Sequence, residues 1–327
     1  MISTILSTML PVVVTLLLGY VAAWHHDFTS KEAAILNRMV LMYAVPLSMF
    51  AGTVATARVT LVQSVPLAAA ILLGIVGMYV LVFLLSRFVL RFSVATCALA
   101  AVTAAGPAVP FLGPAILGRL FGDAGAVPIA VGAIVINITI VPITILILTM
   151  QRKRNLAPSG AGVNPAASAA APTPASAALI EHLKETIKKP LVWAPLLAFV
   201  LVLLNVHVPE MFRQSLQLLG HAAAGVALFA AGIVLAAYKI KLDWRSLLFV
   251  LLKNVVQPAL VLGGLLLLGY GRPIVPMAVV ALAIPTMPIV VMFALEYGVA
   301  EEYAPSILAI STLASLVTVG GFIWLTT

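Results

Sequence analysis

The sequence predicts an all-α polytopic membrane protein whose ten transmembrane helices form two inverted repeats of five. Three observations predict this fold. Hydrophobic residues make up 63% of the 327 residues and charged residues only 9%, with a mean hydropathy of +1.19, unlike the composition of a soluble domain. The apolar residues form runs of about 20, the length that crosses a bilayer as a helix. A tract rich in Ala and Pro leaves five runs on either side of it.

Each apolar run is interpreted as one span. The first run has no basic residues before it and no small-residue cleavage site, so we expect a retained helix and not a signal peptide. The predicted spans lie near residues 2–23, 34–55, 62–86, 94–117, 125–150, 190–208, 214–237, 246–269, 274–296 and 303–325.

The positions of the basic residues predict the orientation of the chain. All but four of the 18 Lys and Arg residues lie in or beside the loops that follow the first, third, fifth and seventh spans. By the positive-inside rule, both termini face outward and the central loop is cytoplasmic. The net charge of +8 is then a topology signal in a bacterial cytoplasmic (inner) membrane protein, and no nucleic-acid partner is needed to explain it. The four exceptions are Arg58, Arg119, Arg213 and Arg272.

The tract NLAPSGAGVNPAASAAAPTPASAA, residues 155–178, separates the two halves. It has almost no charge and no apolar periodicity, so it cannot bury enough surface to order itself. We interpret it as a tether inside a cytoplasmic linker of residues 151–189. The first five-helix repeat is then residues 1–150, and the second is residues 190–327.

The fourth and ninth spans resemble each other. Each has a Pro-x-x-Pro motif in mid-span, Pro107 with Pro110 in one and Pro285 with Pro288 in the other. Because five is an odd number, the second half must enter the membrane in the opposite orientation. Two similar halves of opposite orientation form an inverted repeat, the common plan of secondary transporters.

Both proline motifs predict a broken helix, because proline lacks a backbone donor and clashes with the preceding turn. Both lie near the bilayer midplane, where non-helical backbone is tolerated only if it is buried in protein or lines a watered cavity. The half-helix after each break points its electropositive N-terminus at the midplane, and two such ends with unpaired N–H groups favour an anion. The expected binding residues are Gly106, Pro107, Ala108, Val109, Pro110, Pro285, Thr286, Met287 and Pro288.

Three polar residues of neighbouring spans join these candidates. Asn137 lies about midway along the fifth span, and could either reach the first break or make an interhelical hydrogen bond. Ser311 and Thr312 of the tenth span could face the site or bond the carbonyls of their own helix.

Four further residues are candidates for ion coupling or anion attraction. His221, near the outward end of the seventh span, could relay protons or simply be solvated. Lys253, Asn254 and Gln257 lie in the first turns of the eighth span. Lys253 could attract anions from the cytoplasm, but the interpretation that we favour is that its amine extends to the lipid headgroups.

Several functions are disfavoured by what the spans do not contain. No acidic residue lies at mid-depth, which argues against a proton relay through carboxylates. His25, His26 and Asp27 form a loop cluster without the further ligands of a metal site, so we expect no metal and no cofactor. Coupling to Na⁺, coupling to H⁺ and uniport driven by the membrane potential stay open. No nucleophile with a base converges with other groups at one depth, so an enzyme is not expected.

Five blocks of sequence carry a family resemblance that covers essentially the whole chain except the tether. They are LNRMVLMYAVPLSMFAGTV in the second predicted span, GPAVPFLGPAILGRLFGDAGAVPIAVGAIVINITIVPITILIL in the fourth and fifth, LKNVVQPALVL in the eighth, and IPTMPIVVMFALEYG with ISTLASLVTV in the last two. The chain resembles the auxin efflux carrier family, and within it the bacterial malonate transporters. The resemblance implies crossing broken helices, a scaffold part and a moving transport part as in bile-acid sodium symporters, carriage of organic anions and a homodimer.

The resulting hypothesis is a secondary transporter that moves a small organic anion, a dicarboxylate such as malonate, by alternating access around a midplane site. The alternatives are an exporter of auxin-like aromatic carboxylates, and a non-transporting sensor or channel with the same fold. Relatives often carry a polar residue beside the first break, where this chain has Ala104, Ala105 and Ala108. That departure weakens transfer of the plant hormone as substrate and leaves backbone groups to do more of the binding.

Overall fold

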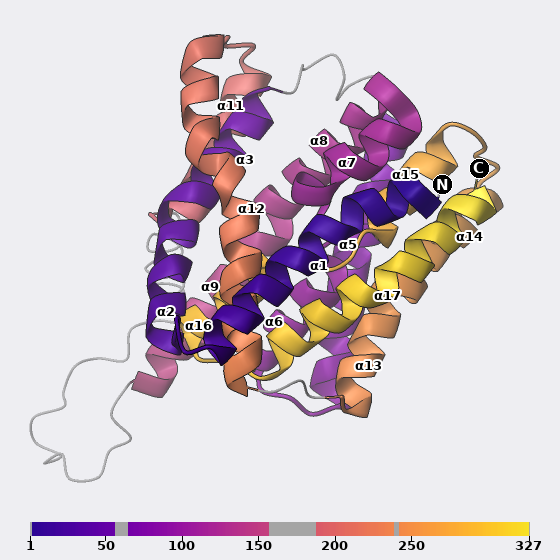
Figure 1. Cartoon of the computed structure of the whole chain (residues 1–327). Coiled ribbons are helices and arrows are strands. Elements are labelled where there is room, and N and C mark those ends of the chain that lie inside the picture. Colours follow the sequence, from indigo (N-terminus) through magenta and orange to yellow (C-terminus); the bar gives the residue numbers. More distant parts are fainter. Residues whose placement is uncertain (1, 56–64, 157–187, 239–241, 327) are drawn as a thin grey trace, which may run out of the picture.

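The computed structural model folds nearly all of the residues that it describes into helices, and no strand is assigned among them (Figure 1). The prediction of an all-α protein is therefore confirmed for that part of the chain. Most of the predicted linker, residues 157–187, lies outside the described residues. The described residues are 2–55, 65–156, 188–238 and 242–326.

Six of the described helices are long and apolar enough to cross a bilayer by length and composition. They are Lys31–Val54, Val65–Val89, Val127–Arg152, Glu210–Ala237, Trp244–Leu267 and Tyr303–Thr326. Shorter apolar helices accompany them, and two of these are the first halves of interrupted spans. The shorter helices are Val13–Trp24, Val94–Ala105, Pro190–Leu203 and Ile274–Ala283.

The first half of the chain forms helices close to the first five predicted spans. They are α1 (Ile2–Trp24), α2 (Ser30–Met39), η1 (Val40–Ala44), α3 (Val45–Val54), α5 (Val65–Leu84), η2 (Leu85–Val89), α6 (Val94–Ala105), α7 (Val109–Phe121), η3 (Gly122–Gly125), α8 (Ala126–Val135), η4 (Ile136–Ile140) and α9 (Val141–Leu156).

The second half forms helices close to the other five. They are α11 (Pro190–Leu203), α12 (Glu210–Tyr238), α13 (Trp244–Leu251), η5 (Leu252–Val256), α14 (Gln257–Leu267), α15 (Ile274–Ala283), α16 (Ile289–Tyr297) and α17 (Tyr303–Thr326).

Polar side chains cap the N-termini of three of these helices. The side-chain oxygens of Thr29, Ser93 and Asp243 accept hydrogen bonds from backbone N–H groups in the first turns of α2, α6 and α13. Thr29 also forms a capping box with Glu32. These bonds satisfy donors that a helix start leaves without a partner, and they place the three helix starts at the ends of apolar runs.

Three π-turns occur where a proline follows within the same apolar run. The proline ring clashes with the carbonyl one turn earlier and offers no N–H, and a widened turn accommodates both defects without ending the helix. The second, fifth and eighth spans therefore continue through their prolines. The π-turns are η1, η4 and η5, and the prolines are Pro46, Pro142 and Pro258.

The helices pack as two groups. The first group contains α1, α2, α3, α11 and α12, whose strongest contacts are with one another. The second group contains α5 to α9 and α13 to α17. In Figure 1, α1 and α17 lie side by side along the boundary between the groups, and both chain ends lie at the same end of the bundle.

Close approach of α1 and α12 depends on two glycines. A Cβ on Gly19 would lie 2.0 Å from the carbonyl oxygen of Phe229, and a Cβ on Gly232 would lie 2.1 Å from that of Leu16. Both positions therefore admit no side chain. Small residues that let two backbones meet are a common basis of helix association in membranes, and here they make α1 and α12 one tightly packed pair.

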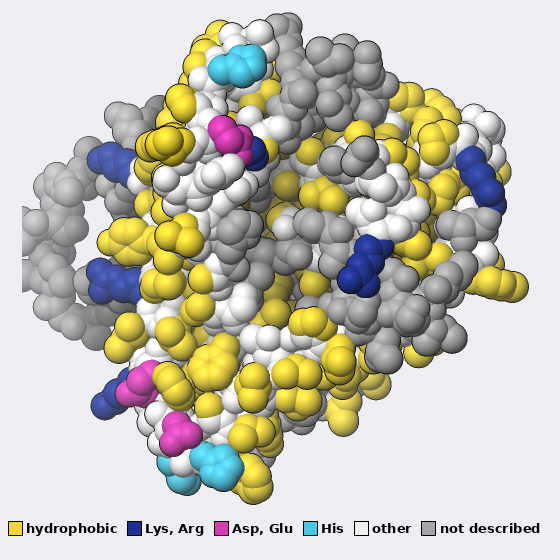
Figure 2. Space-filling view, turned by 45° about the horizontal axis from the view of Figure 1, so that its top comes forward, with side chains coloured by type: hydrophobic (Ala, Val, Ile, Leu, Met, Phe, Trp, Pro, Cys, Tyr) yellow, Lys and Arg dark blue, Asp and Glu magenta, His cyan; other side chains and the backbone are white. Residues whose placement is uncertain are grey.

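The outer surface of the described residues is apolar. Leu267 is 90% exposed and Leu73 is 71% exposed, which suits a helix surface that faces lipid and not water. Figure 2 shows hydrophobic side chains spread over one face, with its acidic and histidine side chains near the top and bottom edges. The same view shows Lys and Arg side chains at several places between these edges.

Two predicted spans are interrupted in the middle, as the proline motifs indicate. Helix α6 ends at Ala105 and α7 begins at Val109, while α15 ends at Ala283 and α16 begins at Ile289. The prediction that both spans break is confirmed. These two interruptions place the candidate site.

Candidate functional site

The two interruptions cross and pair with each other. An isolated antiparallel bridge joins Pro107 to Thr286. Its two hydrogen bonds run from the N–H of Ala108 to the carbonyl of Pro285, 2.8 Å, and from the N–H of Met287 to the carbonyl of Gly106, 3.1 Å. Residues about 180 apart in the sequence thus form one short piece of sheet inside a helical protein, which we call the crossing (residues 106–108 and 285–287).

The pairing corrects one sequence-based expectation. The half-helix starts were expected to offer unpaired N–H groups to an anion, but at the crossing the N–H groups of Ala108 and Met287 both donate to carbonyls of the opposite interruption. The reason is that buried backbone donors without partners are costly, and the two interruptions satisfy each other.

Thr286 ties the crossing to two further helices. Its hydroxyl donates to the carbonyl of Thr103 in α6 at 2.6 Å, and its N–H donates to Oγ of Ser311 in α17 at 3.2 Å. The Ser311 hydroxyl donates to Oδ1 of Asn254 at 2.7 Å, and Nδ2 of Asn254 donates to the carbonyl of Ser311 at 2.8 Å. This chain of bonds holds one interruption against α17 and η5.

Lys253 does not extend to the headgroups, so that expectation was wrong. Its side chain is 0% exposed, and Nζ donates to the carbonyl of Leu282 at 2.7 Å and to Oε1 of Gln257 at 2.9 Å. Nε2 of Gln257 in turn donates to the carbonyls of Ala105, 2.9 Å, and Gly74, 3.2 Å. The break in α15 leaves terminal carbonyls without helical partners, and these attract the ammonium inward.

A cavity of about 180 Å³ lies beside the crossing, between the two helix groups. Its polar lining among the described residues comes from threonine hydroxyls and backbone atoms, and it contains no charged side chain. The N-terminal starts of α7 and α16 lie at its wall. The lining residues are Pro11, Thr15, Ala108, Leu112, Gly225, Leu228, Pro285, Thr286, Pro288, Leu308 and Thr312.

Five of the residues expected at the site line this cavity: Ala108, Pro285, Thr286, Pro288 and Thr312. A second set is buried at or next to the crossing without lining the cavity. That set is Gly106, Pro107, Val109, Met287 and Ser311.

The remaining candidates lie apart from the cavity lining. Pro110 is half-buried in the first turn of α7. Asn137 is buried in η4, its Oδ1 has no hydrogen-bond partner, and it does not line the cavity. Lys253, Asn254 and Gln257 lie behind the crossing. His221 belongs to α12, but its side chain is outside the described residues.

Sequence reasoning missed the contribution of the first helix group. Pro11 and Thr15 of α1 and Gly225 and Leu228 of α12 line the cavity from the first helix group. The hydroxyl of Thr15 donates to the carbonyl of Pro11 at 2.7 Å. A proline inside the first apolar span was a usable signal for this wall, of the same kind that marked the two interruptions.

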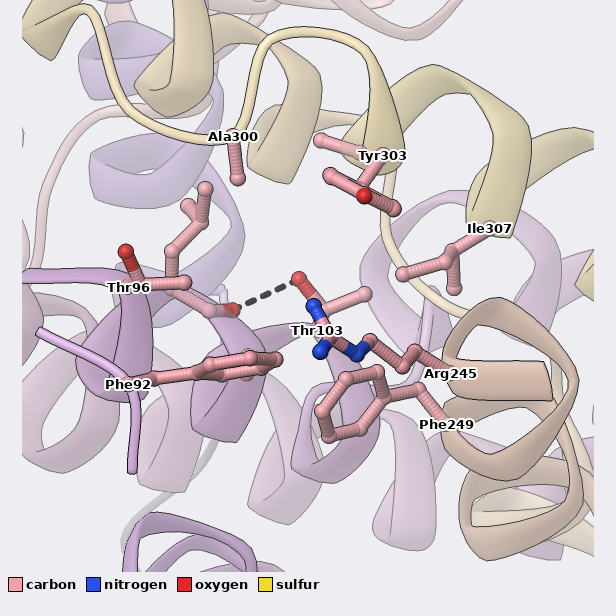
Figure 3. A pocket seen from close by; sticks show the side chains of 11 residues that line it. Phe92, Thr96, Thr103, Arg245, Phe249, Ala300, Tyr303 and Ile307 are labelled. Atoms are coloured by element: carbon pink, nitrogen blue, oxygen red, sulfur yellow. Dashed lines mark hydrogen bonds between the residues drawn. The ribbon is translucent and has the colours of Figure 1, made fainter. Parts of the chain in front are cut away.

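A second cavity of about 170 Å³ is lined by residues of α6 and of the segment just before it, and by residues near the loop that precedes α17 (Figure 3). The Arg245 guanidinium lies over the ring of Phe92, 5.2 Å from its centroid. At the back of the cavity the Thr103 hydroxyl donates to the carbonyl of Leu99 at 2.6 Å. This cavity is mostly apolar, and Thr103 connects its wall to the crossing through Thr286.

Comparison with known proteins gives consistent matches over nearly the whole chain. Residues 4–323 match the family described as membrane transport protein. The chain is 28% identical over 324 residues to a protein of Escherichia coli (strain K12) named "Uncharacterized transporter YfdV", covering 97% of this chain and 96% of that protein. It is 26% identical over 321 residues to a protein of Rhizobium meliloti (strain 1021) named "Putative malonate transporter", covering 97% of this chain and 94% of that protein.

Proposed function

Because the chain belongs to the membrane transport protein family, the family of the auxin efflux carriers, we propose that it is a secondary transporter of a small organic anion. The observation that carries the proposal is the crossing of two interrupted helices beside a cavity between two helix groups. Interrupted helices that meet at one depth form the substrate sites of many secondary transporters. In this proposal the substrate binds in the 180 Å³ cavity.

The division into two groups supports alternating access. The first group packs around the glycine contacts of α1 with α12, and the second group contains the crossing. We propose that the first group is the scaffold and that the second moves against it. The cavity would then open to one side of the membrane at a time, because its walls come from both groups.

Charge favours an anion in this cavity. The N-terminal ends of α7 and α16 carry partial positive charge. The hydroxyls of Thr15, Thr286 and Thr312 line the cavity but donate to the carbonyls of Pro11, Thr103 and Leu308. Each hydroxyl must therefore exchange that bond to donate to a carboxylate. Among the described residues, no acidic side chain lines the cavity to repel a carboxylate. The proposed binding residues are therefore these three threonines, which lie beside the helix starts marked by Ala108 and Pro288.

Size favours a small substrate over an aromatic one. The cavity of about 180 Å³ is smaller than the roughly 300–1,000 Å³ that hold drug-sized ligands. A short dicarboxylate fits this volume better than an auxin-like aromatic carboxylate does. The relative named for malonate makes malonate the first substrate to test.

We further propose ten spans in two inverted five-helix repeats, with both termini outside and the central loop in the cytoplasm of a bacterial inner-membrane protein. The two interrupted pairs α6–α7 and α15–α16 supply the fourth and ninth spans. Figure 1 supports an even number of crossings, because both chain ends lie at the same end of the bundle. The homodimer expected from the family resemblance belongs to the same proposal.

A sensor or channel of the same fold is the competing function, and an enzyme is disfavoured by the family match. Uptake of labelled malonate into proteoliposomes separates these functions. We expect saturable uptake that unlabelled malonate blocks and that an indole carboxylate blocks poorly. A carrier also shows counterflow, in which malonate trapped inside accelerates entry of label, whereas a channel does not. Absence of binding and of counterflow for every short mono- and dicarboxylate would contradict the proposal.

A further inference from the structure

Lys253 is a buried cation that the proposed transport site does not use. Its side chain is 0% exposed, among the largest fully buried side chains of the described residues. The π-turn η5 and the start of α14 place Lys253, Asn254 and Gln257 on the inner side of the eighth span. A charged amine inside a membrane helix is costly, so such a residue needs specific partners and commonly has a function.

The partners of Lys253 are dipoles and not carboxylates. Its Nζ donates to the carbonyl of Leu282, near the C-terminal end of α15, and to Oε1 of Gln257. Nε2 of Gln257 in turn donates to the carbonyl of Ala105, the last residue of α6. No ion pair between described residues includes Lys253. Its charge is therefore balanced by the carbonyl ends of the two half-helices that lead into the crossing.

These carbonyl ends are the groups that bind a coupling cation in other secondary transporters, where half-helix C-termini and unwound carbonyls coordinate Na⁺. Here protein side chains donate to three of these carbonyls. Thr286 bonds the carbonyl of Thr103, Gln257 bonds that of Ala105, and Lys253 bonds that of Leu282. Within the crossing, the carbonyls of Gly106 and Pro285 accept from the N–H groups of Met287 and Ala108.

We infer that Lys253 is a covalently tethered cation, which occupies the position of a bound sodium ion behind the crossing and makes the structure of this carrier independent of sodium. Leu282 is three residues from Pro285 of the cavity wall, so at most about 11 Å of chain separates them. At an effective dielectric constant of about 20, a unit charge roughly 10 Å from a bound monoanion changes its affinity by roughly tenfold, and the free energy is roughly twice as large for a dianion. Lys253 therefore also contributes to anion binding without touching the substrate.

The first test measures the thermal stability of purified protein in detergent, and it needs no substrate. Lys253→Ala should lower the melting temperature, and propylammonium chloride should restore part of the loss because a free amine can occupy the vacated position. Propanol, the neutral analogue, should restore nothing. Lys253→Met fills the same space without charge, so it should be destabilised and should not respond to propylammonium. Lys188→Ala, at an exposed position, is the control and should behave as wild type.

Two outcomes of this test would overturn the inference. One is a Lys253→Met variant that melts as wild type does, because the charge would then be unnecessary. The other is equal rescue of Lys253→Ala by propanol and propylammonium, because volume alone would then explain the loss. If neither variant can be purified, the inference is tested on the wild-type protein, whose melting temperature must stay unchanged when choline replaces Na⁺. A lower melting temperature in choline would overturn the inference.

The second test rests on the proposed function and uses labelled malonate. Wild-type uptake should be the same with Na⁺ or choline on both sides. Lys253→Met should bind malonate, a dianion near neutral pH, roughly a hundredfold more weakly, or about tenfold for each carboxylate charge. Sodium-dependent uptake by the wild type would overturn the inference while supporting the transport proposal. Absence of malonate uptake together with amine rescue of Lys253→Ala would instead leave the tethered cation in place and overturn malonate as substrate.

Discussion

The hydroxyl of Thr286 donates a 2.6 Å hydrogen bond to the carbonyl of Thr103, which lies 183 residues earlier in the chain. Thr286 also lines the cavity beside the crossing. One side chain thus joins the two interrupted spans and faces the proposed substrate. Its contribution to each role can be separated by substitution.

Thr286→Val keeps the volume of the side chain and removes its hydroxyl. We expect a loss of about 1 kcal/mol in the free energy of unfolding, because the buried carbonyl of Thr103 loses its donor. If the hydroxyl turns from the Thr103 carbonyl to the substrate when malonate binds, malonate affinity should fall as well, because the valine offers no hydrogen to either acceptor. Melting temperature and a binding isotherm on the same preparation measure the two effects.

Thr286→Ser is the matched control, because it keeps the hydroxyl and removes only a methyl group. It should retain most of the affinity. If the serine and valine variants bind malonate equally well, the hydroxyl does not contribute to the site.

Gly106→Ala tests how closely the two interruptions approach. A Cβ at Gly106 would lie 2.5 Å from Cε of Met287 and 2.8 Å from the carbonyl oxygen of Val102. The backbone at Gly106 has φ −90°, which any residue adopts, so the expected cost is steric. We expect the variant to be destabilised by roughly 1–3 kcal/mol, seen as a lower melting temperature.

Gly118→Ala is the matched control in α7, where an added Cβ meets no heavy atom within 4 Å. Alanine stabilises a helix interior relative to glycine, so the melting temperature should stay the same or rise. A Gly106→Ala variant that melts as Gly118→Ala does would show that the crossing is looser than described.

Gly232→Ala tests the contact between α1 and α12. The added Cβ would lie 2.1 Å from the backbone carbonyl oxygen of Leu16, and backbone cannot move aside as a flexible side chain can. We expect the two helices to separate and the melting temperature to fall, whereas Gly321→Ala in α17, with nothing within 4 Å, should have no such effect. Equal stability of the two variants would argue against a rigid scaffold pair.

Tyr297→Phe tests a contact between the two helix groups. Nζ of Lys189, just before α11, donates to the Tyr297 hydroxyl at the end of α16 at 2.5 Å, and to Oγ1 of Thr149 in α9 at 3.1 Å. If the second group moves against the first, this bond must break in each cycle. Removing a bond worth about 1 kcal/mol should raise the initial rate of malonate uptake up to roughly fivefold.

The control for this variant is Tyr43→Phe in η1, where the tyrosine is 62% exposed and the hydroxyl should not affect the rate. A slower uptake by Tyr297→Phe at unchanged melting temperature would indicate that the contact is needed for the cycle and does not resist it.

Local chemistry made the helices and their interruptions predictable. A run of apolar residues commits a segment to a membrane helix because unpaired backbone groups cannot remain in lipid, and a mid-span Pro-x-x-Pro breaks that helix because of the proline ring itself. Pro107 and Pro285 therefore indicated both interruptions from neighbouring residues alone. The helix caps at Thr29 and Ser93 follow from the same kind of short-range bond.

Contacts between distant segments were not predictable in this way. The partners of the Ala108 and Met287 N–H groups come from the opposite interruption, and no short-range pattern reveals them. The same holds for Lys253, whose sequence neighbours suit a helix end at the headgroups, but whose amine is held inside by the carbonyl of Leu282. Whether a charge is buried depends on which acceptor the fold brings to it. The cavity wall from α1 and α12 depends on how the two helix groups pack. Both properties therefore arise from tertiary packing and not from the order of residues along any one span.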